Sequence, residues 1–168
     1  ASWLDIDGTR RDEKHTGVHG GRLGEWILAP ASGTIRAAWR SNWQWGWEGS
    51  LLISHAREDL NLESGAPFYY SAFDHLNFDE IKHFEIGQKI SRGQKLARVS
   101  RPGGKQIYLP EVHWEVWEVW ADRLGWKKNM YNAPVWYNTS AHLIDPLYML
   151  ALHKRSSNSL NVEITPYD

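Results

Sequence analysis

The stretch Glu111-Val112-His113-Trp114-Glu115-Val116-Trp117-Glu118-Val119-Trp120 is the most regular segment of the sequence, and its β-branched and aromatic residues are typical of a strand. Side chains alternate along a strand, so one face is mixed in character: Glu111, His113, Glu115, Trp117 and Val119. The other face is apolar apart from Glu118: Val112, Trp114, Val116 and Trp120. An imidazole between two acids is costly to bury unless water, a metal or a groove lies against it. We therefore predict that Glu111 and His113 point into a site.

The rest of the chain is consistent with a β-rich domain. Short runs of β-branched and aromatic residues predict strands at 34–39, 50–55, 68–73, 95–99 and 112–120. Turn-forming residues separate these runs at 30–33, 47–49, 92–93 and 101–104. This spacing indicates an antiparallel all-β domain. A short helical turn is expected within 77–84, and a short C-terminal helix is expected at 146–154 with Asp145 as its N-cap.

Composition limits the possible functions. The chain has 168 residues, 42% of them hydrophobic, which suits one folded domain. We assign residues 1–155 to that single domain and residues 156–168 to a C-terminal tail. The net charge of −1 gives no attraction to nucleic acid or to an anionic membrane surface. No membrane-spanning run and no signal peptide are expected from the pattern, and we expect a monomer.

The histidines suggest a metal site. His15 and His19 lie close together near the start, and His113 lies far along the chain. Three histidines plus one open position can form a catalytic zinc site. With no cysteine in the chain, only His, Asp and Glu remain as strong ligands. We predict a zinc hydrolase with these three ligands, although three imidazoles would also accept copper, nickel or cobalt. Gly17 disfavours a helix here, so a loop or strand–turn should carry His15 and His19.

Eleven tryptophans are an unusual number for a chain of this length. Four of them crowd the segment 39–47, and packing in a β-domain explains most individual tryptophans. Tryptophan also lines grooves that hold peptides or sugars, because it offers a large rigid face with a polar edge. We expect Trp43, Trp45 and Trp47 to bind substrate.

Seven short motifs occur in order between residues 8 and 150: His15-Thr16-Gly17-Val18-His19, Pro30-Ala31-Ser32-Gly33-Thr34-Ile35, Ile53-Ser54-His55 after Gly49, Phe73-Asp74-His75-Leu76, Gly87-Gln88-Lys89-Ile90-Ser91-Arg92-Gly93-Gln94, Glu111-Val112-His113-Trp114-Glu115 and Asp145-Pro146-Leu147-Tyr148-Met149-Leu150. Each motif alone is weak, but their order is specific. Together they resemble the lysostaphin-type, or LytM-like, zinc metalloendopeptidases, which are peptidoglycan hydrolases.

The resemblance implies a LytM-like duplicated hybrid motif, a β-sandwich or barrel of antiparallel sheets with zinc (Zn²⁺) on the floor of a groove. It implies hydrolysis of cross-bridge or stem peptides of bacterial peptidoglycan, by an enzyme that is periplasmic or secreted. His15, His19 and His113 correspond to the zinc ligands, and His75 to a catalytic residue. His55 and Glu115 correspond to residues that support the strands, or that contact a metal-binding side chain without binding the metal themselves.

Two residues differ from the family pattern. His19 stands where the family has an Asp ligand, and imidazole also binds zinc. Glu111 stands where the family has a catalytic His. A carboxylate can act as a general base, but while ionised it cannot donate to an oxyanion, which leaves that role to His75. The same differences allow an alternative: a catalytically silent module that binds cell wall or regulates another hydrolase. A sugar-phosphotransferase carrier domain is a weaker alternative, because it leaves the tryptophans unexplained.

Overall fold

The computed structural model describes residues 3–4, 10–11, 18–43, 45–120, 127–128, 134–135, 141–147 and 149. The strands in these ranges are β1 (Trp3–Leu4), β2 (Arg10–Arg11), β3 (Val18–Gly20), β4 (Trp26–Leu28), β5 (Gly33–Trp43), β6 (Gly46–Ala56), β7 (Phe68–Leu76), β8 (Lys89–Ile90), β9 (Lys95–Arg98), β10 (Val112–Val119), β11 (Lys127–Lys128), β12 (Pro134–Val135) and β13 (Ala141–Ile144). One short α-helix, α1 (Phe78–Ile81), and two 3₁₀ turns, η1 (Arg57–Leu60) and η2 (Pro102–Gly104), are described with them.

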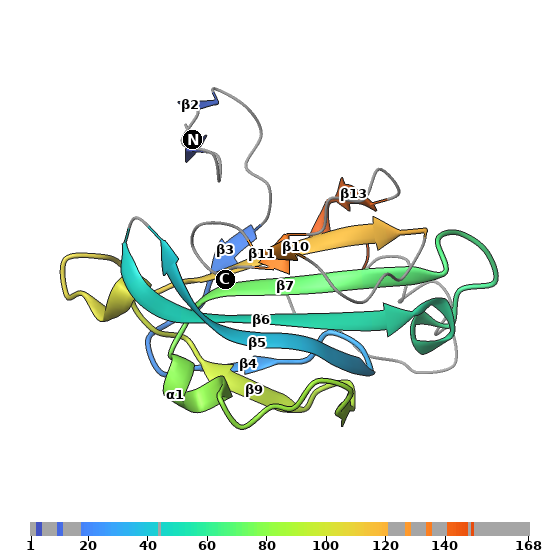
Figure 1. The fold of residues 1–168 in the computed structure, drawn as a ribbon, viewed down its shortest axis with the longest axis horizontal. Coiled ribbons are helices and arrows are strands. Elements are labelled where there is room, and N and C mark those ends of the chain that lie inside the picture. The colour runs from blue at the N-terminus through green and yellow to red at the C-terminus, as the bar shows by residue number, and fades with distance from the viewer. Residues whose placement is uncertain are drawn as a thin grey trace, which may run out of the picture.

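The main sheet has seven strands, which pair antiparallel in the order β13-β10-β7-β6-β5-β8, and β3 also pairs with β10 (Figure 1). The prediction of an antiparallel all-β fold is therefore confirmed. The prediction of a turn at 47–49 was wrong, because those residues lie inside β6. The chain reverses just before them, where Gly46 has a φ of 118° that side-chain-bearing residues rarely adopt.

The helical predictions fall partly within the described residues. Inside the predicted turn at 77–84, α1 forms, and the Asn77 side chain caps it by accepting from the Asp79 N–H. At the C-terminus, the Leu147 N–H donates to Asp145 Oδ1 at 2.9 Å, as expected for an N-cap. Residues 150–154 of that helix and the tail at 156–168 lie outside the described ranges. None of the helices described has the length and hydrophobicity needed to cross a bilayer.

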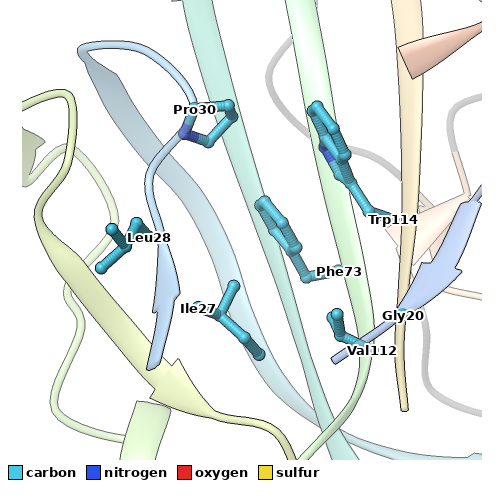
Figure 2. Close-up of a pocket in the computed structure, with 7 residues that line it drawn as sticks. All are labelled: Gly20, Ile27, Leu28, Pro30, Phe73, Val112 and Trp114. Carbon is cyan, nitrogen blue, oxygen red and sulfur yellow. The ribbon is translucent and has the colours of Figure 1, made fainter. Parts of the chain in front are cut away.

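The sheet buries one apolar face against β4, β9 and α1 (Figure 1). Side chains from both layers form this core: Ile27, Ala29, Ile35, Leu51, Ile53, Phe73, Leu76, Ile81, Phe84, Ile90, Leu96, Ala97 and Val99. Figure 2 shows an apolar pocket on this side, where Ile27 and Leu28 of β4 lie across from Phe73, Val112 and Trp114. Val112 and Trp114 occupy the face of β10 opposite to His113, so this pocket is separate from the predicted site.

The opposite face of the sheet changes character along the strands. One end carries an apolar cluster of Leu52, Tyr70, Ala72 and Val119, with Trp39 and Trp117 packed against it. The other end carries polar and charged side chains: Glu48, Ser50, Asp74, His113 and Glu115. We expected the face of β10 that carries His113 to line a site, and the structure places His113 and Glu115 among its buried residues.

A β-bulge in β7 brings two consecutive residues to this polar end. Leu51 pairs with Phe73, but Gly49 pairs with Leu76, so β7 contains one extra residue opposite β6. Asp74 and His75 fill the extra space, and His75 takes a left-handed φ of 64°. Bulges redirect side chains in this way and are common beside active sites. The Ser100 hydroxyl donates to the carbonyl of His75 at 2.6 Å and holds the bulge in place.

Candidate functional site

The register of three adjacent strands gathers the predicted metal-binding positions. His113 of β10 lies directly opposite Asp74 of β7 on one side and directly opposite His19 of β3 on the other. Two of the three predicted ligand positions, 19 and 113, are therefore neighbours across a strand pair, although they are remote in sequence. His15 and the side chain of His19 lie outside the described residues.

A hydrogen bond to Glu115 orients the ring of His113. Its ring is 3% exposed, and Nε2 lies 2.9 Å from Glu115 Oε1. An ionised carboxylate can only accept, so Nε2 carries the hydrogen and the lone pair of the neutral ring is on Nδ1. A carboxylate that fixes the tautomer of a histidine in this way is the usual companion of a metal ligand. The other oxygen of Glu115 accepts from Trp117 Nε1 at 3.1 Å, which fixes the carboxylate in turn.

His75 lies between two carboxylates. Its Nδ1 lies 3.0 and 3.1 Å from the two oxygens of Glu48, and its Nε2 lies 3.8 Å from Glu111 Oε1. Burial by itself would lower the pKa of His75, but the hydrogen bond to Glu48 and the charges of Glu48, Asp74 and Glu111 outweigh it and leave that pKa above its ordinary value. The arrangement favours the protonated imidazolium form.

Asp74 adds a further acid to the same cluster. Ser50 donates a short hydrogen bond to Asp74 Oδ1. Burial raises the pKa of Asp74, and it does so against the opposing effects of His113, the Ser50 hydrogen bond and His75. The cost of desolvating this carboxylate is therefore not fully offset by the groups around it.

Carboxylates and imidazoles gather at this end of the sheet face. The described part of the site holds four carboxylates, of Glu48, Asp74, Glu111 and Glu115, around the imidazoles of His75 and His113. A bound cation is one way in which a protein offsets the cost of burying carboxylates close together. No three His, Cys, Asp or Glu side chains in the described ranges form a metal cage by themselves. Of the three predicted metal ligands, His113 is the one whose side chain the structure describes.

Aromatic side chains form one wall of the site. Trp45, at the tip of the β5–β6 hairpin, lies edge-on to the rings of His75 and Tyr108, with centroids 6.2 and 5.4 Å away. Trp47 points away from the face that carries Glu48, and the Arg40 guanidinium lies over its ring. Of the two predicted substrate-binding tryptophans whose side chains the structure describes, Trp45 lies against His75. The side chain of Trp43 lies outside the described residues.

His55 is placed at a different part of the sheet. Its Nδ1 lies 2.8 Å from the carbonyl oxygen of Ser32, and its Nε2 lies 2.9 Å from Ser71 Oγ. The ring is fully buried and links β6 to β7 and to the segment before β5. These contacts are what we expect of a histidine that supports the strands, which is one of the two roles predicted for His55.

Sequence reasoning missed Glu48 and Asp74. The turn predicted at 47–49 includes Glu48, and the motif Phe73-Asp74-His75-Leu76 gives a role to His75 alone. The strand alternation of Glu48, Ser50 and Leu52 could have placed Glu48 on a definite face. Nothing in the sequence alone indicated the bulge that brings His75 to it.

Solved structures with a similar fold include lysostaphin. The catalytic domain of the antimicrobial peptidase lysostaphin from Staphylococcus simulans matches with a TM-score of 0.51 and 20% sequence identity, over 89% of this chain and 86% of that one. The solution structure of lysostaphin matches with a TM-score of 0.50 and 20% identity, over 98% of this chain and 51% of that one. The chain thus spans about half the length of that lysostaphin chain.

No protein-family model matches the sequence, and no curated protein matches it either. At 20% sequence identity, this structural likeness is evidence for the fold alone. It agrees with the antiparallel sheet and with the order of motifs along the chain. The chain therefore has the LytM-like fold of the lysostaphin-type peptidases.

Proposed function

We propose that this chain is a zinc-dependent endopeptidase that hydrolyses peptide bonds of bacterial peptidoglycan, in a cross-bridge or a stem peptide. The observation that carries the proposal is the placement of His75 between Glu48 and Glu111, on the sheet face that also holds His113. The fold shared with lysostaphin, an antimicrobial peptidase, supports the choice of reaction.

His15, His19 and His113 would hold the metal. The tautomer of His113 set by Glu115 supports this assignment. When bound, zinc supplies Lewis acidity, which makes water a nucleophile near neutral pH and polarises a carbonyl group. The remaining steps belong to the protein's own side chains.

Glu111 and His75 divide the proton chemistry between them. Glu111 is partly exposed, with 28% of its side chain accessible, and would accept a proton from the attacking water. His75 keeps one hydrogen on Nδ1, toward Glu48, and can hold a second on Nε2. From Nε2 it can donate to the oxygen of the scissile carbonyl as negative charge develops there. The carboxylate of Glu111 would thus act as the general base, and the imidazole of His75 would act as the hydrogen-bond donor to the oxyanion.

The substrate would lie against the aromatic wall of Trp45 and Tyr108. Ile107 and Leu109, the chain neighbours of Tyr108, are both 81% exposed. Such a surface suits an extended peptide with apolar side chains, because aromatic faces bind apolar groups and peptide planes without a charge requirement. Since peptidoglycan lies outside the cytoplasmic membrane, we propose a periplasmic or secreted protein.

The alternative is a silent module that binds cell wall or regulates another hydrolase. The specific observation in its favour is Glu111, which stands at the position of the family's catalytic His. Such a module has no need of a proton acceptor beside His75, whereas the structure places Glu111 3.8 Å from it. We therefore prefer the active enzyme.

A zymogram on purified peptidoglycan tests the proposal. The protein should clear the substrate, a chelator should stop clearing, and added zinc should restore it. Mass spectrometry of the released fragments should show new peptide termini rather than cleaved glycan. Binding to peptidoglycan without any released fragment, at full zinc loading, would establish the silent module instead.

A further inference from the structure

Glu48 is a buried carboxylate whose oxygens face the catalytic histidine. Its side chain is 2% exposed, and both oxygens lie within 3.1 Å of His75 Nδ1. A carboxylate in such a place loses most of its hydration, which is costly unless its hydrogen-bonding capacity is used. The imidazole of His75 is one hydrogen-bonding partner that uses this capacity.

The second donor to Glu48 comes from a different loop. The Gly103 N–H, in the turn η2, donates to Glu48 Oε2 at 3.0 Å. A Cβ atom at Gly103 would lie 2.2 Å from the carbonyl oxygen of Trp45, and its φ of 58° also favours glycine. Only a residue without a side chain lets η2 approach the β5–β6 hairpin closely enough for this bond.

These contacts fix the direction of the imidazole. A carboxylate cannot donate, so the nitrogen that faces Glu48 must carry a hydrogen. Nδ1 is therefore the protonated atom whether the ring is neutral or charged, and Nε2 is left on the side of Glu111. The edge of the Trp45 ring limits rotation of the imidazole from another side.

We propose that Glu48 is a positioning residue, which holds the Nδ1–H of His75 and so directs Nε2 toward Glu111 and the bond to be cleaved. The turn η2 takes part by fixing Glu48 through Gly103. The catalytic contribution of Glu48 rests on the proposed peptidase function, whereas the proton position on His75 is a property of the protein itself.

The first experiment needs no substrate. In zinc-loaded protein with ¹⁵N-labelled histidine, assigned with a His75→Gln variant, His75 Nδ1 should carry a hydrogen with the downfield resonance of a bond to a carboxylate. In Glu48→Gln that resonance should move upfield or exchange away. A wild-type His75 whose Nδ1 lacks a hydrogen would overturn the proposal, whether or not the variant folds.

The second experiment measures hydrolysis of peptidoglycan fragments. Glu48→Gln should lower kcat by about 10- to 100-fold, as expected for loss of a residue that orients a catalytic group, while KM and bound zinc stay constant. Gly103→Ala should lower kcat in the same direction, because it displaces the N–H that fixes Glu48. Glu63→Gln, at an exposed position, is the matched control and should behave as wild type.

The two experiments separate the two claims. A wild-type protein that hydrolyses nothing but shows the Nδ1 hydrogen would refute the peptidase function and keep the assignment of the proton. A Glu48→Gln variant that folds, binds zinc and retains kcat within twofold of wild type would refute the positioning role alone.

Discussion

The two ends of one sheet face make opposite use of the same strands. At one end, β6, β7 and β10 contribute Leu52, Tyr70 and Val119 to an apolar cluster. At the other end, the same strands contribute Glu48, Asp74 and His113, all polar and mostly buried. Burial of the first group stabilises the fold, whereas burial of the second costs free energy that hydrogen bonds only partly return.

This contrast separates stability from chemistry. A fold needs no cluster of carboxylates around two imidazoles, so the polar end is best explained by what it binds and does. If so, substitutions at the apolar end should unfold the protein without changing its chemistry. Substitutions at the polar end should remove the chemistry with little loss of stability, or even with a gain.

The largest effect is expected at His113. His113→Ala should reduce zinc affinity by more than about 100-fold, since losing only an outer contact of a ligand already costs 10- to 100-fold. Elemental analysis after dialysis would measure the bound metal. His83→Ala, at an exposed site, should keep the full metal content. Stoichiometric zinc in His113→Ala would exclude His113 as a ligand.

Glu111 should affect turnover but not metal content. Glu111→Gln removes the proton acceptor and should lower kcat by about 10²- to 10⁴-fold, the usual range for general base catalysis. Steady-state hydrolysis together with elemental analysis separates the two effects. Glu118→Gln on the same strand is the control and should keep its activity. Undiminished turnover in Glu111→Gln would assign the base role elsewhere.

The apolar end should determine stability. Leu52 is fully buried, and Leu52→Ala should lower the free energy of unfolding by about 2–5 kcal/mol through lost burial and a new cavity. Urea denaturation measures the change, and Leu23→Ala, at a position 57% exposed, should be close to neutral. A Leu52→Ala protein that keeps its stability but loses zinc would contradict the division between the two ends.

Asp74 should show the smallest effect, and with the opposite sign. In metal-free protein, Asp74→Asn removes an incompletely compensated charge and retains an acceptor for Ser50, so it should raise the free energy of unfolding by about 1 kcal/mol. The comparison is urea denaturation at neutral pH, with exposed Asp79→Asn as the control. Destabilisation in Asp74→Asn would mean that the carboxylate already has adequate partners.

Much of the fold could be predicted from alternation and turn residues. The strand around His113 was predicted from its period of two, and Val112, Trp114 and Val116 do pack together on the face opposite to His113, because that signal depends only on local geometry. The prediction was wrong for Trp120, which follows the end of β10 and is 53% exposed. The β5–β6 hairpin was predicted too short, because tryptophans and a glutamate at 43–48 look like a loop when their burial is unknown.

The site was only partly predictable for a different reason. Motif order identified His75 and Glu111 as one site, and the structure places them 3.8 Å apart. Glu48 could not be identified, because its role depends on a register shift between β6 and β7 and on the approach of Gly103 from a distant turn. Such contacts between distant segments leave no periodic trace in the sequence.

The extra residue in β7 also limits how this protein can be re-engineered. If the pleat continued regularly from Phe73 with no bulge, Asp74 would stay on the polar face, and the imidazole of His75 would lie on the side of the sheet occupied by Leu51. A designer who grafts the site onto another sheet must therefore transplant an irregularity together with the side chains.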